Sequence, residues 1–265
     1  MGTTANNRHC EWNRADSNCL ISTAAAELNA CHGPSITVSQ GVSQQSNEEL
    51  LNIEIDRAFI AAEYANGVFP ETVESIILTV DNLISQSRHL LDKIQRMKHR
   101  AHHLGLKIGI RTYLDAHNLS KKSTYFFDLY YLINNCDIIM CNIYPDPIFA
   151  QGGTENAVSK VIGVYWSLKE RLTAINPTIQ VVIGETGWAS SGIMRGGVQT
   201  STLKLVDYWK RIGKWASEFQ IPLYFFEAID QPWKADFVVA SAHFGWWTRD
   251  DTNFREKIVS LLKSS

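Results

Sequence analysis

The sequence predicts an α/β fold of the (β/α)8-barrel type, in which parallel strands alternate with helices. Short apolar runs bounded by glycine, such as Val181–Gly184, are typical of buried strands in a parallel sheet. Segments with helical periodicity lie between these runs along the chain, which is the pattern of βα units. The 265 residues also suit one such barrel, which typically needs about 250.

Six segments are predicted to be strands, because each is a short apolar run between turn residues. They are Ser35–Val42, Val73–Val80, Leu106–Tyr113, Asp137–Ile143, Val181–Glu185 and Pro222–Ala228. A doubtful further strand lies at Arg8–Arg14. A closed barrel of this type contains eight strands, so fewer strands are expected here than a complete barrel has.

Helices are predicted between the strands, where apolar residues recur at helical spacing. Gly105 is expected to cap one of them, and Pro177 to end another. The predicted helices are Cys19–Ala30, Asn47–Tyr64, Gln86–Leu104, Ser123–Asn135, Thr154–Ile175, Thr200–Phe219 and Phe254–Leu262. Residues 1–18 are polar and without a clear period, so we expect an irregular segment there and a single domain over residues 19–265.

The composition is that of a globular protein without a strong net charge. The formal net charge is −2 and the isoelectric point is near 6.4, so we expect no nucleic-acid partner, because such partners require a basic face. No run approaches the roughly 18 apolar residues of a membrane span. The N-terminus lacks the apolar core of a signal peptide, which predicts a chain that is cytoplasmic or truncated at the N-terminus.

Neither a metal nor another cofactor is expected. The five cysteines are odd in number and lack the CxxC spacing of zinc sites. His99, His102 and His103 have a spacing that could suggest a metal site. Arginines and lysines surround them, however, and this favours a solvated basic face of a helix.

The most informative stretch is Gln180–Gly192, with the sequence Q-V-V-I-G-E-T-G-W-A-S-S-G. A carboxylate, Glu185, lies at the end of a predicted strand, and an indole, Trp188, follows it. In (β/α)8 barrels the carboxyl ends of the strands line the active site. Carboxylates commonly cleave glycosidic bonds, and sugar rings stack on aromatic side chains. The stretch therefore predicts sugar chemistry.

Three motifs in this order resemble glycoside hydrolase family seventeen, the β-1,3-glucanases and related glucosyltransferases. G-E-T-G-W-A-S resembles the family's nucleophile signature G-E-T-G-W-P-S, with Ala189 in place of proline. Tyr224–Lys234, Y-F-F-E-A-I-D-Q-P-W-K, is similar to the F-E-A-F-D-Q/E-P-W-K of its bacterial and fungal branches. Asn142-Ile143-Tyr144-Pro145 is a weaker third match, and the resemblance covers roughly Ser35–Thr248.

The resemblance implies roles for several residues. Glu185 would be the nucleophile of a retaining mechanism, and Tyr144 would hydrogen-bond its carboxylate. The other implied substrate-binding residues are Asn82, Trp188, Glu227, Asp230, Trp233 and Lys234. Trp188 and Trp233 would offer stacking faces to a sugar, although Trp233 could instead pack in the core. For Glu185 the simpler alternative is a salt bridge at the end of an ordinary buried strand.

The position of the second catalytic carboxylate departs from the family. Where the family carries V-G-N-E, this chain has Val80-Asp81-Asn82-Leu83. Leucine cannot transfer a proton, so Leu83 cannot be the acid. Asp81, two residues earlier, is the candidate substitute. Glu63 is another, although its surroundings favour a solvated helix residue.

The resemblance also implies which barrel strand each predicted strand corresponds to. Val181–Glu185 would be the seventh barrel strand and Ser35–Val42 the third, so the first βα unit is expected to be missing. The function expected is a glycoside hydrolase or glucosyltransferase that acts on β-1,3-glucan, with a polysaccharide or oligosaccharide as substrate. Two alternatives remain open: a catalytically impaired or inactive barrel that binds glucan or acts as a scaffold, and a truncated fragment of an active enzyme.

Overall fold

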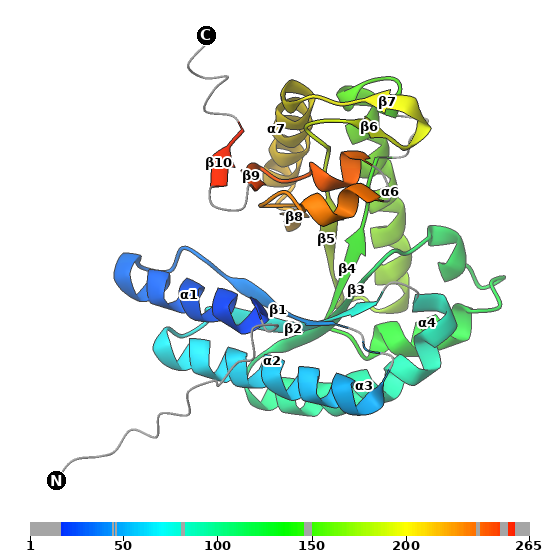
Figure 1. The fold of residues 1–265 in the computed structure, drawn as a ribbon. Helices are drawn as coiled ribbons and strands as arrows, with labels where there is room; N and C mark the ends of the chain where they lie inside the picture. Colours follow the sequence, from blue (N-terminus) through cyan, green and yellow to red (C-terminus); the bar gives the residue numbers. More distant parts are fainter. Residues whose placement is uncertain are drawn as a thin grey trace. The chain divides into compact units, whose positions relative to one another are not determined.

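The computed structural model describes residues 17–43, 45, 47–80, 83–145, 150–236, 239–249 and 254–257. The chain forms two compact units (Figure 1). The first contains Met1–Thr79 and Met97–Ile108, and the second contains Val80–Arg96 and Gly109–Ser265. Helix α3 (Leu83–His103) and strand β3 (Lys107–Thr112) contribute residues to both.

The first unit contains α1 (Ser17–His32), β1 (Val38–Ser43), α2 (Glu48–Val68) and most of β2 (Val73–Val80). β1 and β2 pair in parallel, and α1 packs against α2. The side chain of Asn47 caps α2 by accepting hydrogen bonds from the backbone N–H groups of the first turn. Buried alanines and Phe59 on α2, with Ile76 and Leu78 on β2, fill the apolar core of this unit.

The second unit contains the remaining parallel strands. β3 pairs with β4 (Ile138–Asn142), β4 with β5 (Gln180–Thr186), and β5 with β8 (Leu223–Phe225), each pair in parallel. The helices α4 (Phe126–Asn134), α6 (Thr154–Ile175) and α7 (Thr202–Glu218) follow β3, β4 and β5 in the sequence. Because the strands run parallel, the residues after β4, β5 and β8 gather at one edge of this sheet.

Short elements complete the second unit. β6 and β7 form an antiparallel hairpin after the β5 signature, and β9 pairs antiparallel with β10. These strands are Ile193–Met194, Val198–Gln199, Trp247–Arg249 and Phe254–Glu256. The 3-10 helices are η1 (Ala116–Leu119), η2 (Arg195–Gly197), η3 (Pro232–Asp236) and η4 (Val239–Ala242). None of the helices in the described part of the chain has the length and apolar character that a membrane span requires.

The predicted alternation of strands and helices is confirmed, and the helix Thr154–Ile175 has the predicted bounds. The closing helix predicted at Phe254–Leu262 is wrong at its start. Phe254–Glu256 is strand β10, because its backbone pairs with β9 and this pairing overrides the local helical pattern. Residues 258–262 and the doubtful strand at Arg8–Arg14 lie outside the described residues.

Candidate active site

The carboxylate of Glu185 lies at the carboxyl end of β5 and contacts two side chains, one from the segment after β4 and one from β3. The Tyr144 hydroxyl donates a hydrogen bond of 3.0 Å to Oε2 of Glu185. Nη2 of Arg111, on β3, lies 3.4 Å from Oε1. Both carboxylate oxygens therefore have a partner, and the pair of contacts fixes the direction in which the carboxylate points.

Gly184, the residue before Glu185, has a steric reason to be glycine. A Cβ atom there would lie 2.8 Å from Cβ of Met140 and 3.0 Å from Cγ of Arg111. Real Cβ atoms essentially never approach another carbon as closely as 2.8 Å. The glycine therefore leaves room beside β5 for the Arg111 side chain that reaches Glu185.

Glu185 lines a cavity of about 690 Å³ in the second unit. Tyr113, Tyr144, Phe226 and Phe244 give the cavity aromatic walls. The ring centroid of Tyr144 lies 6.0 Å from those of Phe226 and Phe244. Burial, followed by the charge of Glu185, raises the pKa of the Tyr144 hydroxyl, so the phenol stays protonated and remains a hydrogen-bond donor.

A second carboxyl group, Glu227, follows β8 and the cis peptide bond between Phe226 and Glu227. Its Oε2 accepts a hydrogen bond from Nε2 of Gln231 and lies 3.5 Å from Nζ of Lys234. Its Oε1 is buried and has no hydrogen-bond partner among the described residues. Burial raises the pKa of Glu227 to about 7, against the opposing effect of Lys234, and the charges of Asp230 and Glu185 raise it further.

Asp230 is a buried structural carboxylate of the segment that follows β8. It accepts hydrogen bonds from the backbone N–H of Gly245 at 2.9 Å and from Nζ of Lys257 at 2.7 Å. Nδ1 of His243 lies 3.6 Å from its other oxygen. These partners occupy Asp230 and join the 230, 243–245 and 257 segments, so its contacts are structural and not directed into the cavity beside Glu185.

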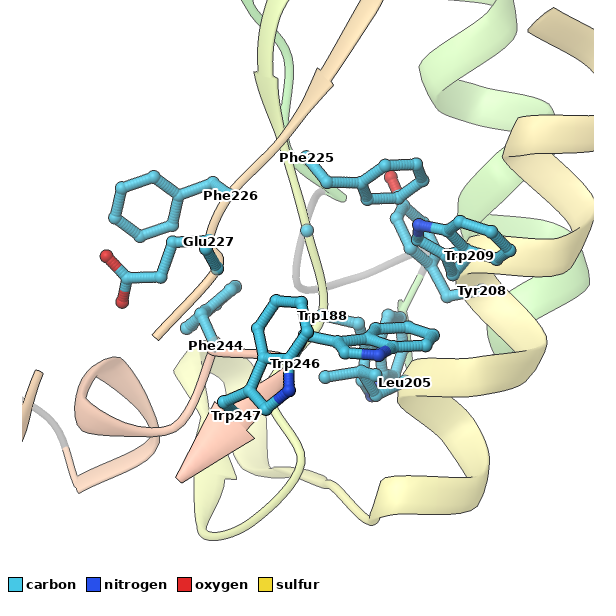
Figure 2. A pocket seen from close by; sticks show the side chains of 12 residues that line it. Trp188, Leu205, Tyr208, Trp209, Phe225, Phe226, Glu227, Phe244, Trp246 and Trp247 are labelled. Carbon is cyan, nitrogen blue, oxygen red and sulfur yellow. The ribbon is translucent and has the colours of Figure 1, made fainter. Parts of the chain in front are cut away.

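A smaller cavity of about 450 Å³ lies beside β8 and α7 (Figure 2). Trp188 forms part of its wall, with an exposed fraction of 1% and its ring centroid 5.7 Å from that of Tyr208. Trp233 differs, since 57% of it is exposed and the Arg249 guanidinium lies 5.1 Å from its ring centroid. Of the two tryptophans predicted to stack on a sugar, Trp233 has an accessible face, whereas Trp188 is packed into the protein.

The model of the BtgE/BtgC glycoside hydrolase domain matches residues 18–245 of this chain. The chain belongs to the BtgE/BtgC glycoside hydrolase domain family. The match includes residues of both compact units and, of the site residues named above, all except Lys257 and Arg249. It agrees with the glucanase resemblance of the three motifs.

Similar proteins agree with this family. A glucan 1,3-β-glucosidase of Schizosaccharomyces pombe is 28% identical over 117 residues, which are 43% of this chain and 36% of that protein. The match to this curated relative thus spans little more than a third of its length.

Solved structures show the fold. An endo-laminarinase from Formosa Hel1_33_131 superimposes with a TM-score of 0.71 at 19% identity, over 95% of this chain and 76% of that chain. A glycoside hydrolase family 17 β-1,3-glucanosyltransferase from Rhizomucor miehei gives 0.62 at 18% identity, over 91% and 82%. These structures confirm the predicted α/β fold of the TIM-barrel type, and the family-model match confirms the predicted glycoside hydrolase family.

The acid/base carboxylate of this BtgE/BtgC-type domain is not assigned at the predicted position, residues 80–83. Leu83 is the first residue of α3 and has an exposed fraction of 2%. Asp81 and Asn82 lie outside the described residues. Glu63 lies on α2 in the first unit, where it pairs with Arg100 at 3.3 Å, as a solvated helix residue would. Among the described residues, Glu227 is a carboxyl group on which the charge of Glu185 acts.

Arg111 is the site residue that the sequence analysis missed. It belongs to no motif of the resemblance. The available signal was a charged residue near the carboxyl end of an otherwise apolar strand, K-I-G-I-R-T. Such a residue favours an acidic partner on another strand, and Glu185 of β5 is that partner.

Proposed function

We propose that this domain is a glycoside hydrolase that acts on β-1,3-glucan by a retaining mechanism, with Glu185 as the nucleophile. The observation that carries the proposal is the arrangement of Glu185 at the wall of the larger cavity, held by Tyr144 and Arg111. The names of the relatives, a glucan 1,3-β-glucosidase, an endo-laminarinase and a β-1,3-glucanosyltransferase, support the substrate class.

The geometry supports the first half of the reaction. A retaining glycosidase attacks the anomeric carbon with a carboxylate and forms a covalent glycosyl-enzyme. Glu185 is oriented for this by contacts to both of its oxygens, and the aromatic rings around Tyr144 give a sugar ring apolar surfaces to pack against. When the ester forms, the charge on Glu185 is lost while Tyr144 keeps its proton, so the phenol stays available to the ester oxygen.

Water or a sugar hydroxyl would then resolve the glycosyl-enzyme. The first gives a hydrolase and the second a glucanosyltransferase, and both use the same nucleophile. The substrate that the proposal names is therefore a β-1,3-linked polysaccharide or oligosaccharide, and either reaction releases or transfers a glucosyl unit from it.

Leu83 favours a second candidate function, a domain that binds glucan without cleaving it quickly. Its buried side chain stands at the family's acid position. Without a proton donor the leaving alkoxide departs slowly, because general acid catalysis contributes about 10²–10⁴-fold. This candidate predicts binding of laminarin oligosaccharides with little or no turnover.

Laminarin turnover by the parent chain, Glu185→Gln and Glu170→Gln separates these functions. Glu170 is an exposed residue of α6 and serves as the matched control. We expect the parent and Glu170→Gln to release or transfer glucosyl units at similar rates. Loss of the nucleophile should lower this rate by about 10³-fold or more. Oligosaccharide binding by calorimetry without turnover in the parent would favour the second candidate, and unchanged turnover in Glu185→Gln would reject the proposal.

A further inference from the structure

We propose that Glu227 is the general acid and base of this domain, in place of the carboxylate that Leu83 cannot supply. The inference rests on the proposed function, with Glu185 as the nucleophile. It assigns a catalytic residue that departs from the family's usual position, and it follows from where Glu227 lies, which of its oxygens is free, and which charges surround it.

Glu227 lines the smaller cavity, which shares Phe226 and Phe244 with the cavity that Glu185 lines, and the charge of Glu185 acts on it. β8 is the direct neighbour of β5 in the sheet, with Thr186 opposite Phe225, and the Phe226 N–H donates to the Thr186 carbonyl at 2.8 Å. Phe226 and Lys234 line the cavity that contains Glu185, and Lys234 pairs with Glu227. Figure 2 shows the Phe226 and Glu227 side chains on the same side of β8, directed away from Tyr208 and Trp209 of α7.

The two oxygens of Glu227 have different surroundings. Oε2 is held by Gln231 and Lys234, while Oε1 is buried and unpartnered among the residues that the structure describes. A buried polar atom without a partner costs free energy. In the protonated carboxyl group, Oε1 is the oxygen that would carry the proton, because Gln231 and Lys234 hold Oε2.

The charges around Glu227 suit a group that both gives and takes a proton. Burial, with the negative charges of Asp230 and Glu185, raises its pKa to about 7, and the positive charge of Lys234 opposes them. The charge of Lys257 also interacts with Glu227, and Lys257 forms an ion pair with Asp230. Both carboxyl groups have a cation beside them, Arg111 for Glu185 and Lys234 for Glu227. They differ because burial and nearby negative charges raise the pKa of Glu227, and a carboxyl group with a raised pKa beside a second carboxylate is typical of an acid and a nucleophile.

The proposed reaction has two steps. The Glu185 carboxylate forms a bond to the anomeric carbon, and the bond from this carbon to the leaving oxygen breaks. Its electron pair goes to that oxygen, which takes the proton from Glu227. In the second step the Glu227 carboxylate takes a proton from water or a sugar hydroxyl, whose oxygen attacks the anomeric carbon and releases Glu185. After the first step Lys234 stabilises the negative charge on Glu227.

The test uses the full chain and the variants Glu227→Gln, Glu227→Asp and Asp81→Asn, with Glu218→Gln as a control at an exposed position of α7. The substrates are laminarin and 2,4-dinitrophenyl β-laminaribioside, whose leaving group needs no proton. Glu227→Gln should lower kcat/KM on laminarin by about 10²–10⁴-fold. It should preserve the initial burst of dinitrophenol. Azide should restore steady turnover and yield the β-glycosyl azide.

The pH profile adds a readout that a structural role would not change. In the parent, kcat/KM on laminarin should fall as the pH rises through about 7, because the acid must be protonated. This fall should be absent in Glu227→Gln. Glu227→Asp keeps a carboxyl group, so it should retain the fall at a lower rate and without azide rescue. Glu227→Asp also provides the test if Glu227→Gln does not fold.

Three outcomes would overturn the assignment. The first is normal laminarin turnover in Glu227→Gln with loss in Asp81→Asn, which would make Asp81 the acid. The second is a parent that forms the covalent intermediate on Glu185 but does not cleave laminarin, which leaves the nucleophile intact and removes Glu227 as the acid. The third is the absence of any intermediate on Glu185, in which case the proposed function fails and the inference with it.

Discussion

The Tyr144 hydroxyl donates a 3.0 Å hydrogen bond to Oε2 of Glu185, across the paired strands β4 and β5. The two residues are 41 positions apart in the sequence, and the parallel register, with Asn142 opposite Glu185, brings them together. This bond and the Arg111 ion pair aim the carboxylate that we propose as the nucleophile.

Tyr144→Phe removes this bond and leaves the ring. A hydrogen bond to a charged group contributes about 1.5–3 kcal/mol, so laminarin kcat/KM should fall about 10- to 100-fold, while the melting temperature changes little. Tyr131→Phe, at an exposed position of α4, is the control and should keep parent activity. Parent-like kinetics in Tyr144→Phe would show that the phenol does not act on Glu185.

Gly245→Ala tests the close packing behind Glu227. A Cβ atom at this position would lie 2.1 Å from the Asp230 backbone nitrogen. Such overpacking typically costs about 1–3 kcal/mol, so urea denaturation should show a lower midpoint. Gly213→Ala, in the interior of α7 with no atom near the added Cβ, should instead stabilise the chain by about 0.5–1 kcal/mol. Equal midpoints for the two variants would contradict this packing.

Lys257→Met breaks the buried ion pair with Asp230. The atoms are 2.7 Å apart and both side chains are only 7% exposed. Removing one partner of a buried pair costs about 3–5 kcal/mol, because the other charge is left uncompensated. Adding Asp230→Asn should recover part of this loss. Arg211→Met breaks an exposed pair with Asp207 and should change the midpoint of urea denaturation far less, because exposed pairs contribute little. A similar loss in both single variants would rule out a special role for the buried pair.

The stability of the folded chain should depend on pH through Glu227. Its pKa is raised from 4.5 to about 7 in the folded state, so the folded state binds more protons than the unfolded state between these values. Stability therefore falls as the pH rises across this window. Melting temperatures of the parent should decrease relative to those of Glu227→Gln between about pH 5 and pH 8, which roughly bracket this window. A constant difference would mean that Glu227 is not buried as described.

Local apolar periodicity was sufficient to predict the regular helices and strands of the fold. The helix Thr154–Ile175 has the predicted bounds, since its apolar periodicity is long and Pro177 follows it. Phe254–Glu256 was predicted as helix and is a strand, because its state depends on pairing with Trp247–Arg249. Such pairing is a long-range contact that local periodicity does not contain.

The same distinction applies to the site. The motifs identified Glu185, Tyr144, Glu227 and Lys234, which the structure places around adjoining strand ends. Arg111 was missed because its partner is on another strand. The motifs also could not show that Trp188 packs against Tyr208, or that Asp230 forms an ion pair with Lys257. Both facts depend on contacts with segments outside the motifs.

The most direct test of the central claim is covalent labelling with a 2-deoxy-2-fluoro laminaribiosyl inactivator, followed by peptide mapping by mass spectrometry. We predict one fluoroglycosyl ester, on Glu185, and none on Glu185→Gln. A label on Glu227, on Glu63 or on no residue of the folded parent chain would contradict the assignment of Glu185 as the nucleophile.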